Sequence, residues 1–139
     1  MRAAAAVTFL VVGLSAGAAA EPERLTLACN GTMANPTTPD DKPVAVSMGI
    51  VVNLATRSVH GFNVTGLADF PVKIVAMNDA TITFFGSDPN PPPPIIKWTI
   101  SGSIDRVTGD VGAVSAGNTD KIATSTTYEL KCRPAERIF

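Results

Sequence analysis

The sequence is poor in the residues that bind metal ions and nucleic acids. One histidine and two cysteines in 139 residues are too few for the tetrahedral nitrogen and sulfur ligand set that zinc usually takes. The 11 lysines and arginines are balanced by 12 aspartates and glutamates, so no basic excess indicates binding to DNA, RNA or an anionic membrane. We therefore predict no metal site and no nucleic-acid partner.

Catalytic motifs are missing as well. The only histidine, His60, would have to serve any Ser-His-Asp triad, and the sequence has no G-x-S-x-G nucleophile elbow. It also has no P-loop and no G-x-G-x-x-G turn, the glycine-rich motifs that hold nucleotide phosphates. Acidic residues are scattered singly apart from Asp40 and Asp41, so no carboxylate pair is marked out for glycoside hydrolysis. We interpret His60 as an exposed residue at a strand end, and we predict no enzymatic activity and no cofactor.

An apolar run at the N-terminus predicts export. Arg2 precedes the apolar stretch Ala3–Leu14, and small residues follow up to Ala18–Ala20, the order of a secretory signal peptide. A membrane anchor is the alternative, but a spanning helix needs about 20 apolar residues, and glycine and serine interrupt this run. We therefore predict a signal peptide over 1–20, a single domain over 21–139, no membrane contact after cleavage, and a periplasmic or secreted location.

The two cysteines, Cys29 and Cys132, predict one disulfide. An even number of cysteines in an exported chain is normally paired, because the compartment is oxidising. Each cysteine is in phase with apolar residues of a strand-like segment, Cys29 with Leu27 and Cys132 with Tyr128 and Leu130. A disulfide needs closely spaced Cα atoms, so the bond would place the first strand of the mature chain beside the last. A reactive thiol pair is disfavoured, since the sequence has no C-x-x-C spacing and no histidine near either cysteine.

The mature sequence alternates with the period of β-strands and shows no sustained helical periodicity. Two loops interrupt it, Asn35–Pro43 and Ser87–Pro94, and the prolines at the end of the second cannot donate hydrogen bonds to a sheet. Asn78 and Asp79 lie between two expected strands and tolerate the positive φ angles of a tight hairpin turn. The expected strands are Leu25–Cys29, Val44–Leu54, Val59–Val64, Val72–Met77, Ala80–Phe85, Trp98–Ile104, Val111–Ala116 and Ala123–Cys132.

Eight strands joined end to end by a disulfide favour a small antiparallel barrel. Barrel closure pairs the first strand with the last and removes the exposed edges of an open sheet. A β-sandwich is the alternative, because it also satisfies the cysteine geometry. In either fold Phe84 and Phe85 point to opposite faces, so one is buried and the other is covered by a loop or exposed. The basic residues are expected on solvated faces: Lys97, Lys121, Lys131 and Arg133.

One short pattern, [N/D]-x-x-T-x-x-V, occurs twice, over 53–59 and over 105–111. Both copies fall at the junction of two strand-like segments. Asparagine, aspartate and threonine side chains accept hydrogen bonds from the backbone of a turn, and glycine adopts the left-handed conformation that a bulged hairpin requires. A calcium loop is disfavoured, because the further acidic ligands of an EF-hand are missing. We interpret five residues as structural turn residues: Asn53, Thr56, Asp105, Thr108 and Gly109.

Two segments carry a resemblance to a known group of proteins. Over 102–109 the sequence is GSIDRVTG, and over 128–134 it is YELKCRP. In these segments the chain resembles small exported proteins of Gram-negative bacteria that share a G-x-I-D-R-x-T-G hairpin and a terminal Y-x-L-x-C-[KR]-P strand. The early Leu27, Cys29 and Gly31 also fit that group. The resemblance implies a periplasmic or secreted location and no assigned chemistry.

Two functional hypotheses follow from this fold. The first is a binding module, in which the barrel holds an unknown small ligand and Trp98, Met48 and Phe84 face the pocket. The second is a protein-interaction role, such as inhibition of a cell-wall hydrolase, with Pro36–Pro43 or Ser87–Pro94 inserting into the partner. The sequence does not indicate the identity of the partner or the oligomeric state.

Overall fold

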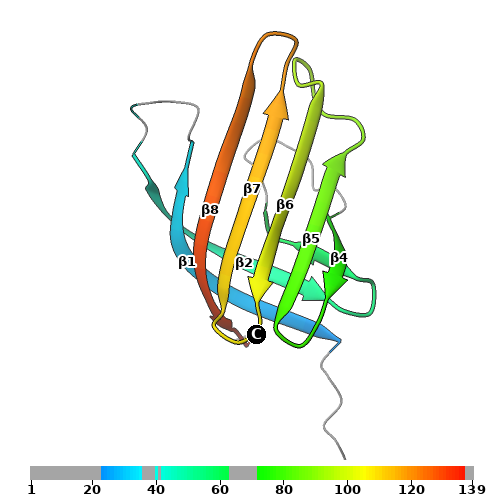
Figure 1. Cartoon of the computed structure of the whole chain (residues 1–139), viewed down its shortest axis with the longest axis vertical. Helices are drawn as coiled ribbons and strands as arrows, with labels where there is room; N and C mark the ends of the chain where they lie inside the picture. The colour runs from blue at the N-terminus through cyan, green and yellow to red at the C-terminus, as the bar shows by residue number, and fades with distance from the viewer. Residues whose placement is uncertain (1–22, 36–39, 41, 63–71, 137–139) are drawn as a thin grey trace, which may run out of the picture.

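A computed structural model of the chain describes residues 23–35, 40, 42–62 and 72–136 (Figure 1). The described residues form eight strands and no helix, and the strands close into one antiparallel barrel. This confirms the predicted barrel and excludes the β-sandwich. The predicted signal peptide, 1–20, lies outside the described residues. The strands are β1 (Arg24–Ala34), β2 (Val44–Asn53), β3 (Ser58–His60), β4 (Val72–Met77), β5 (Thr81–Asp88), β6 (Lys97–Asp105), β7 (Asp110–Asn118) and β8 (Ala123–Pro134).

The barrel closes where β1 pairs with β8. Cys29 lies directly opposite Cys132 in this pairing, and the two form a disulfide with an S–S distance of 2.01 Å. The Cys132 N–H donates to the carbonyl oxygen of Gly109, away from β1. The cysteines therefore form a pair without mutual backbone hydrogen bonds, the type in which facing side chains come closest. The predicted disulfide is confirmed, and it fastens the seam between the first and last strands.

Alternating residues of every strand point into the barrel and fill it. Ile50, Ile82 and Ile100, on three different strands, are almost completely buried. Near the middle, Phe62 stacks on Phe84 with ring centroids 5.2 Å apart and meets Tyr128 edge-on at 5.8 Å. The interior at this level is a packed core, as expected for a barrel of eight strands, which is just wide enough for side chains to fill.

The aromatic and sulfur side chains that we expected to face a pocket belong to this core. Phe84 is completely buried, Trp98 is 9% exposed and Met48 is partly buried against the core. The Trp98 ring packs on Gly117, where a Cβ atom would overlap it, and its Nε1 has no hydrogen-bond partner among the described residues. Phe85 points outward and is 45% exposed, so the prediction of opposite faces for the two phenylalanines is confirmed.

The strand limits differ from the prediction mainly in β1. The sequence places its end at Cys29, because Asn30 and Gly31 are typical of turns, but β1 continues to Ala34. A Cβ atom at Gly31 would overlap the backbone oxygen of Glu129, so glycine lets β1 lie close to β8. The third strand is shorter than the predicted Val59–Val64, and positions 63 and 64 lie outside the described residues.

The two ends of the barrel are built differently. At the turn end, the lower end in Figure 1, short turns over 54–57, 78–80 and 106–109 join the strands. At the loop end, the longer segments 89–96 and 119–122 join them. The β4–β5 turn contains Asn78 and Asp79, a pair that tolerates positive φ angles but does not use them here. Instead, Asn78 Oδ1 accepts hydrogen bonds from the N–H groups of Ala80 and Thr81, both 2.8 Å, and no positive φ occurs there.

Candidate functional site

The two copies of the turn motif both lie at the turn end. In the first copy the Thr56 N–H donates to Asn53 Oδ1 at 3.0 Å, and the Thr56 hydroxyl contacts the Ser58 hydroxyl at 2.8 Å. Leu54 N–H reaches across to the carbonyl oxygen of Glu23, which ties this turn to the start of β1. Asn53 and Thr56 therefore stabilise the β2–β3 turn, as predicted.

The second copy forms a denser network. Asp105 Oδ1 accepts the N–H groups of Val107 and Thr108, both at 2.8 Å, and the Thr108 hydroxyl donates to Asp110 at 2.7 Å. These hydrogen bonds from the Thr108 and Val107 backbone favour the ionised form and lower the pKa of Asp105. Gly109 has a φ of 78°, the left-handed conformation predicted for it. Asp105, Thr108 and Gly109 thus fix the β6–β7 turn.

Between these turns, the structure has a cavity of about 480 Å³ at the mouth of the barrel. A volume of this size suits a small organic molecule. The deep part of the lining is apolar and comes from five strands, so the cavity exists only because the closed barrel brings their ends together. Its apolar lining residues are Leu25, Leu27, Val52, Ile82, Ile104 and Cys132, and its remaining lining is 105–109 together with Arg133 and Pro134.

The charged part of the lining has two arginines and one aspartate. Arg106 Nη1 donates to the carbonyl oxygen of Asn78 at 2.8 Å, which ties the β6–β7 turn to the β4–β5 turn. Arg133, near the end of β8, is exposed, and its side chain makes no hydrogen bond or ion pair with the described residues. The carboxylate of Asp105 accepts hydrogen bonds from the backbone of its own turn. The mouth therefore combines an apolar interior with a cationic rim.

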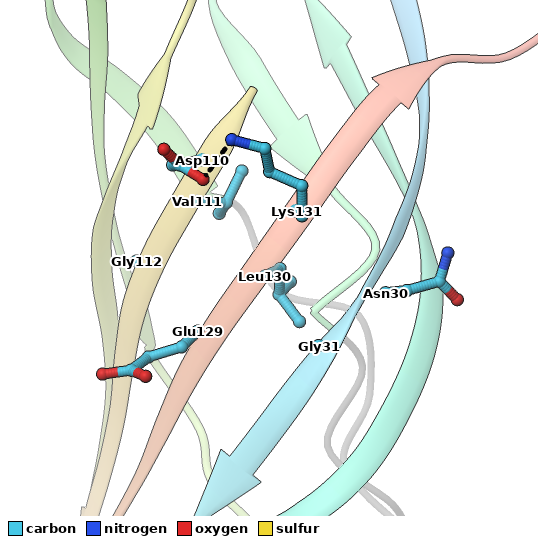
Figure 2. Close-up of a pocket in the computed structure, with 8 residues that line it drawn as sticks. All are labelled: Asn30, Gly31, Asp110, Val111, Gly112, Glu129, Leu130 and Lys131. Atoms are coloured by element: carbon cyan, nitrogen blue, oxygen red, sulfur yellow. Dashed lines mark hydrogen bonds and ion pairs between the residues drawn. The ribbon is translucent and has the colours of Figure 1, made fainter. Parts of the chain in front are cut away.

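A second depression lies on the outer face of the barrel, over β1, β7 and β8 (Figure 2). Across it Lys131 reaches Asp110, with Nζ and Oδ1 2.8 Å apart, and both side chains are more than 60% exposed. The hydrogen bond from Lys131, followed by the one from Thr108, lowers the pKa of Asp110. Such an exposed pair contributes little free energy. The depression is open and its central charges are already paired, so the mouth is the stronger candidate site.

The only histidine has a partner that the sequence analysis missed. His60 Nε2 lies 3.2 Å from the Ser58 hydroxyl, which in turn contacts Thr56. His60 is exposed, as predicted, and Ser58 is only 7% exposed. Their i, i+2 spacing on one strand was the available signal, since such residues share a face. A serine and a histidine alone, without an identified oxyanion hole, do not establish catalysis.

Other classes of site are not found in the part of the chain that the structure describes. No group of three or more histidine, cysteine, aspartate or glutamate residues there could hold a metal ion. In the same residues no helix is long and apolar enough to cross a membrane.

The cavity residues were not predicted from the sequence. Leu25 and Val52 were predicted to be on strands, and Arg133 was interpreted as part of a solvated face. The available signal was positional: each apolar lining residue lies within a few residues of a turn or strand end. Only the strand register shows that these ends surround one space.

The chain was compared with protein-family models, with curated proteins and with solved structures, and none of the three comparisons found a match.

Proposed function

We propose that this protein is a binding module that holds a small, largely apolar molecule in the mouth of its barrel. The observation that carries the proposal is the cavity of about 480 Å³ whose deep lining is apolar. Burial of apolar surface is worth about 25 cal/mol per Å², so an apolar ligand gains affinity from leaving water at this site. The disulfide fits an oxidising compartment, and we place the protein in the periplasm or outside the cell.

A cavity-filling variant tests this proposal. Leu27 lines the cavity and is partly exposed, so the larger side chain of Leu27→Trp occupies the space that a ligand would use. Val114→Trp is the matched control, because Val114 is 42% exposed on a different surface of the barrel. The neutral fluorescent probe N-phenylnaphthylamine should bind wild type and Val114→Trp but not Leu27→Trp.

The measurement is a fluorescence titration, with circular dichroism to verify that each variant is folded. Equal binding by all three proteins, or no binding by wild type, would contradict the proposal.

The alternative function is protein interaction, such as inhibition of a cell-wall hydrolase. The observation in its favour is a pair of exposed isoleucines at the loop end, Ile96 (60% exposed) and Ile122 (63%). The Ile96 N–H donates to Asn118 O, and the Thr119 N–H donates to Ile122 O, both at 2.8 Å, so both residues are anchored at the same end of β7. Exposed apolar residues grouped in this way are typical of contact surfaces.

An inhibition assay separates this alternative from ligand binding. The purified protein should slow a lysozyme-type hydrolase, and the double variant Ile96→Asp, Ile122→Asp should not. Val107→Asp is the control, since Val107 is 79% exposed at the opposite end. A hydrolase rate unaffected by wild type would remove this alternative.

A further inference from the structure

The arginines of the barrel gather at one of its two ends. Every arginine among the described residues lies at the turn end: Arg24, Arg57, Arg106 and Arg133. Arg24 pairs with Asn53 at the edge of the β2–β3 turn, and Arg133 pairs with Ala28 near the end of β8. Three of the described lysines, Lys42, Lys97 and Lys121, lie at the loop end, whereas Lys131 lies at the turn end and is bonded to Asp110. The end that carries the cavity is thus the end that carries guanidinium groups.

Arginine at a cavity rim indicates a particular kind of ligand group. The guanidinium is planar, permanently charged and able to donate two parallel hydrogen bonds, which matches a carboxylate or phosphate. Of the charged residues in the cavity lining, Arg106 and Arg133 are cationic and only Asp105 is anionic. The lining therefore carries two positive charges against one negative charge, and the Asp105 carboxylate already accepts two backbone hydrogen bonds from its own turn.

Other acidic residues at this end do not remove that excess from the cavity. Glu23, Asp79 and Glu136 are exposed and do not belong to the lining. Asp110 is bonded to Lys131 and Thr108. The cavity itself therefore presents apolar walls inside and guanidinium groups at its opening.

We propose that the ligand of the mouth is an amphiphile, with an alkyl part in the cavity and a single carboxylate or phosphate group held by Arg106 and Arg133. This inference rests on the proposed function and specifies the chemical class of the ligand. The apolar walls alone favour any alkyl chain, whereas the two arginines favour an anionic head over a neutral or cationic one.

The test compares three probes with the same alkyl chain and different head groups: decanoate, decanol and decyltrimethylammonium. Affinities are measured by displacement of the neutral fluorescent probe, below the concentrations at which the amphiphiles form micelles. Wild type should bind decanoate about tenfold or more tightly than decanol, since a charge-assisted hydrogen bond is worth at least about 1.4 kcal/mol. Decyltrimethylammonium should bind most weakly. Decyl phosphate in place of decanoate shows which anionic head is preferred.

Variants of the two arginines assign the effect to the rim. Arg133→Gln should bring the affinity for decanoate close to that for decanol, and Arg133→Lys should restore only part of the difference. Lys121→Gln at the loop end is the matched control and should leave all affinities unchanged. Arg106→Gln also removes the hydrogen bond to Asn78, so circular dichroism and thermal unfolding accompany its titration.

The outcomes distinguish this inference from the proposed function. If decanol binds as tightly as decanoate and Arg133→Gln changes neither, the ligand class is wrong although the cavity still binds apolar molecules. If neither probe binds wild type, the proposed function fails as well. Raising the salt concentration should reduce the preference for decanoate, because exposed charges are screened.

Discussion

The two turns that share one sequence pattern both contain a left-handed residue at the same position but have different neighbours. They lie four strands apart in a barrel of eight, so they face each other across the mouth. Position for position, Gly109 in the β6–β7 turn corresponds to Arg57 in the β2–β3 turn. Both adopt the left-handed conformation, with φ angles of 78° and 51°. The pattern therefore specifies a left-handed residue in both places, although only one copy has the glycine that signals it.

The surroundings explain why one copy requires glycine. A Cβ atom at Gly109 would overlap the carbonyl oxygen of Cys132, because the end of β8 passes directly beside this turn. Arg57 is exposed, and its carbonyl oxygen accepts the N–H of Ile74 at 2.9 Å. The local sequence therefore selects the turn, whereas the neighbouring strand determines which side chain fits at its left-handed position.

The largest change in stability is expected when the disulfide that holds β8 in place is removed. The double variant Cys29→Ser, Cys132→Ser should lose about 4–5 kcal/mol of unfolding free energy, the chain-entropy value for closing a loop of roughly 100 residues. Denaturant unfolding measures the loss. In the variant, amide exchange at Thr108 should accelerate more than at Thr56, since only the β6–β7 turn packs on β8 beside the bond. Equal acceleration in both turns would contradict the assigned role of β8.

The second test adds one methyl group at the crowded turn. Gly109→Ala should cost roughly 2–5 kcal/mol, the sum of a left-handed alanine and an overlap with backbone. Denaturant unfolding checks the value, with Gly112→Ala as the control. A Cβ atom at Gly112 meets nothing within 4 Å, so that variant should be nearly neutral. Similar stability of the two variants would show that the β8 backbone does not constrain Gly109.

The third test uses pH, because, of the two turns, only in the β6–β7 turn do backbone N–H groups donate to a carboxylate. The lowered pKa of Asp105 means that ionisation stabilises the fold above the ordinary value of 3.8. This contribution is lost as the pH falls from that value through the lower folded pKa. Amide exchange at Val107 and Thr108 should therefore accelerate in acid relative to Thr56, whose acceptor Asn53 does not titrate. Asp105→Asn should abolish the difference in pH dependence.

The smallest change in unfolding free energy is expected at the exposed β2–β3 turn. Arg57→Gly relieves the left-handed strain of about 1–2 kcal/mol but raises the entropy of the unfolded chain by the equivalent of about 0.4–1 kcal/mol. The net result should be a stabilisation of about 0.5 kcal/mol, measurable as a shift of the denaturation midpoint. Destabilisation by more than about 1 kcal/mol would mean that the Arg57 side chain makes an important contact.

The sequence predicts the barrel well because strand alternation and turn chemistry are local, and because two cysteines allow only one intramolecular pairing. Alternation places Ile50, Ile82 and Ile100 inside, and the two in-phase cysteines imply that the first strand meets the last. The hydrogen bonds of Asn53 and Asp105 span only a few residues, so their turns were also predictable. These interactions do not depend on the arrangement of distant strands.

Three features could not be predicted from local sequence: the cavity, the left-handed conformation of Arg57 and the close approach of strands at Gly31. Leu25 and Ile82 face one space only because the register of the closed barrel brings their strand ends together. The left-handed conformation of Arg57 has no residue signal, since glycine and asparagine are the types that usually mark it. Gly31 resembles a turn residue in sequence, but in the barrel it permits close contact between β1 and β8.

The position of the disulfide has a mechanical consequence. β1 begins and β8 ends at the same end of the barrel, so tension applied at Glu23 and Ala135 would peel these strands apart one hydrogen bond at a time. Peeling can proceed along β1 only as far as Cys29, where the covalent link transfers the load past the barrel. Under oxidising conditions the remaining strands are shielded from the pull, and a force spectroscopy trace should lengthen fully only after a reductant is added.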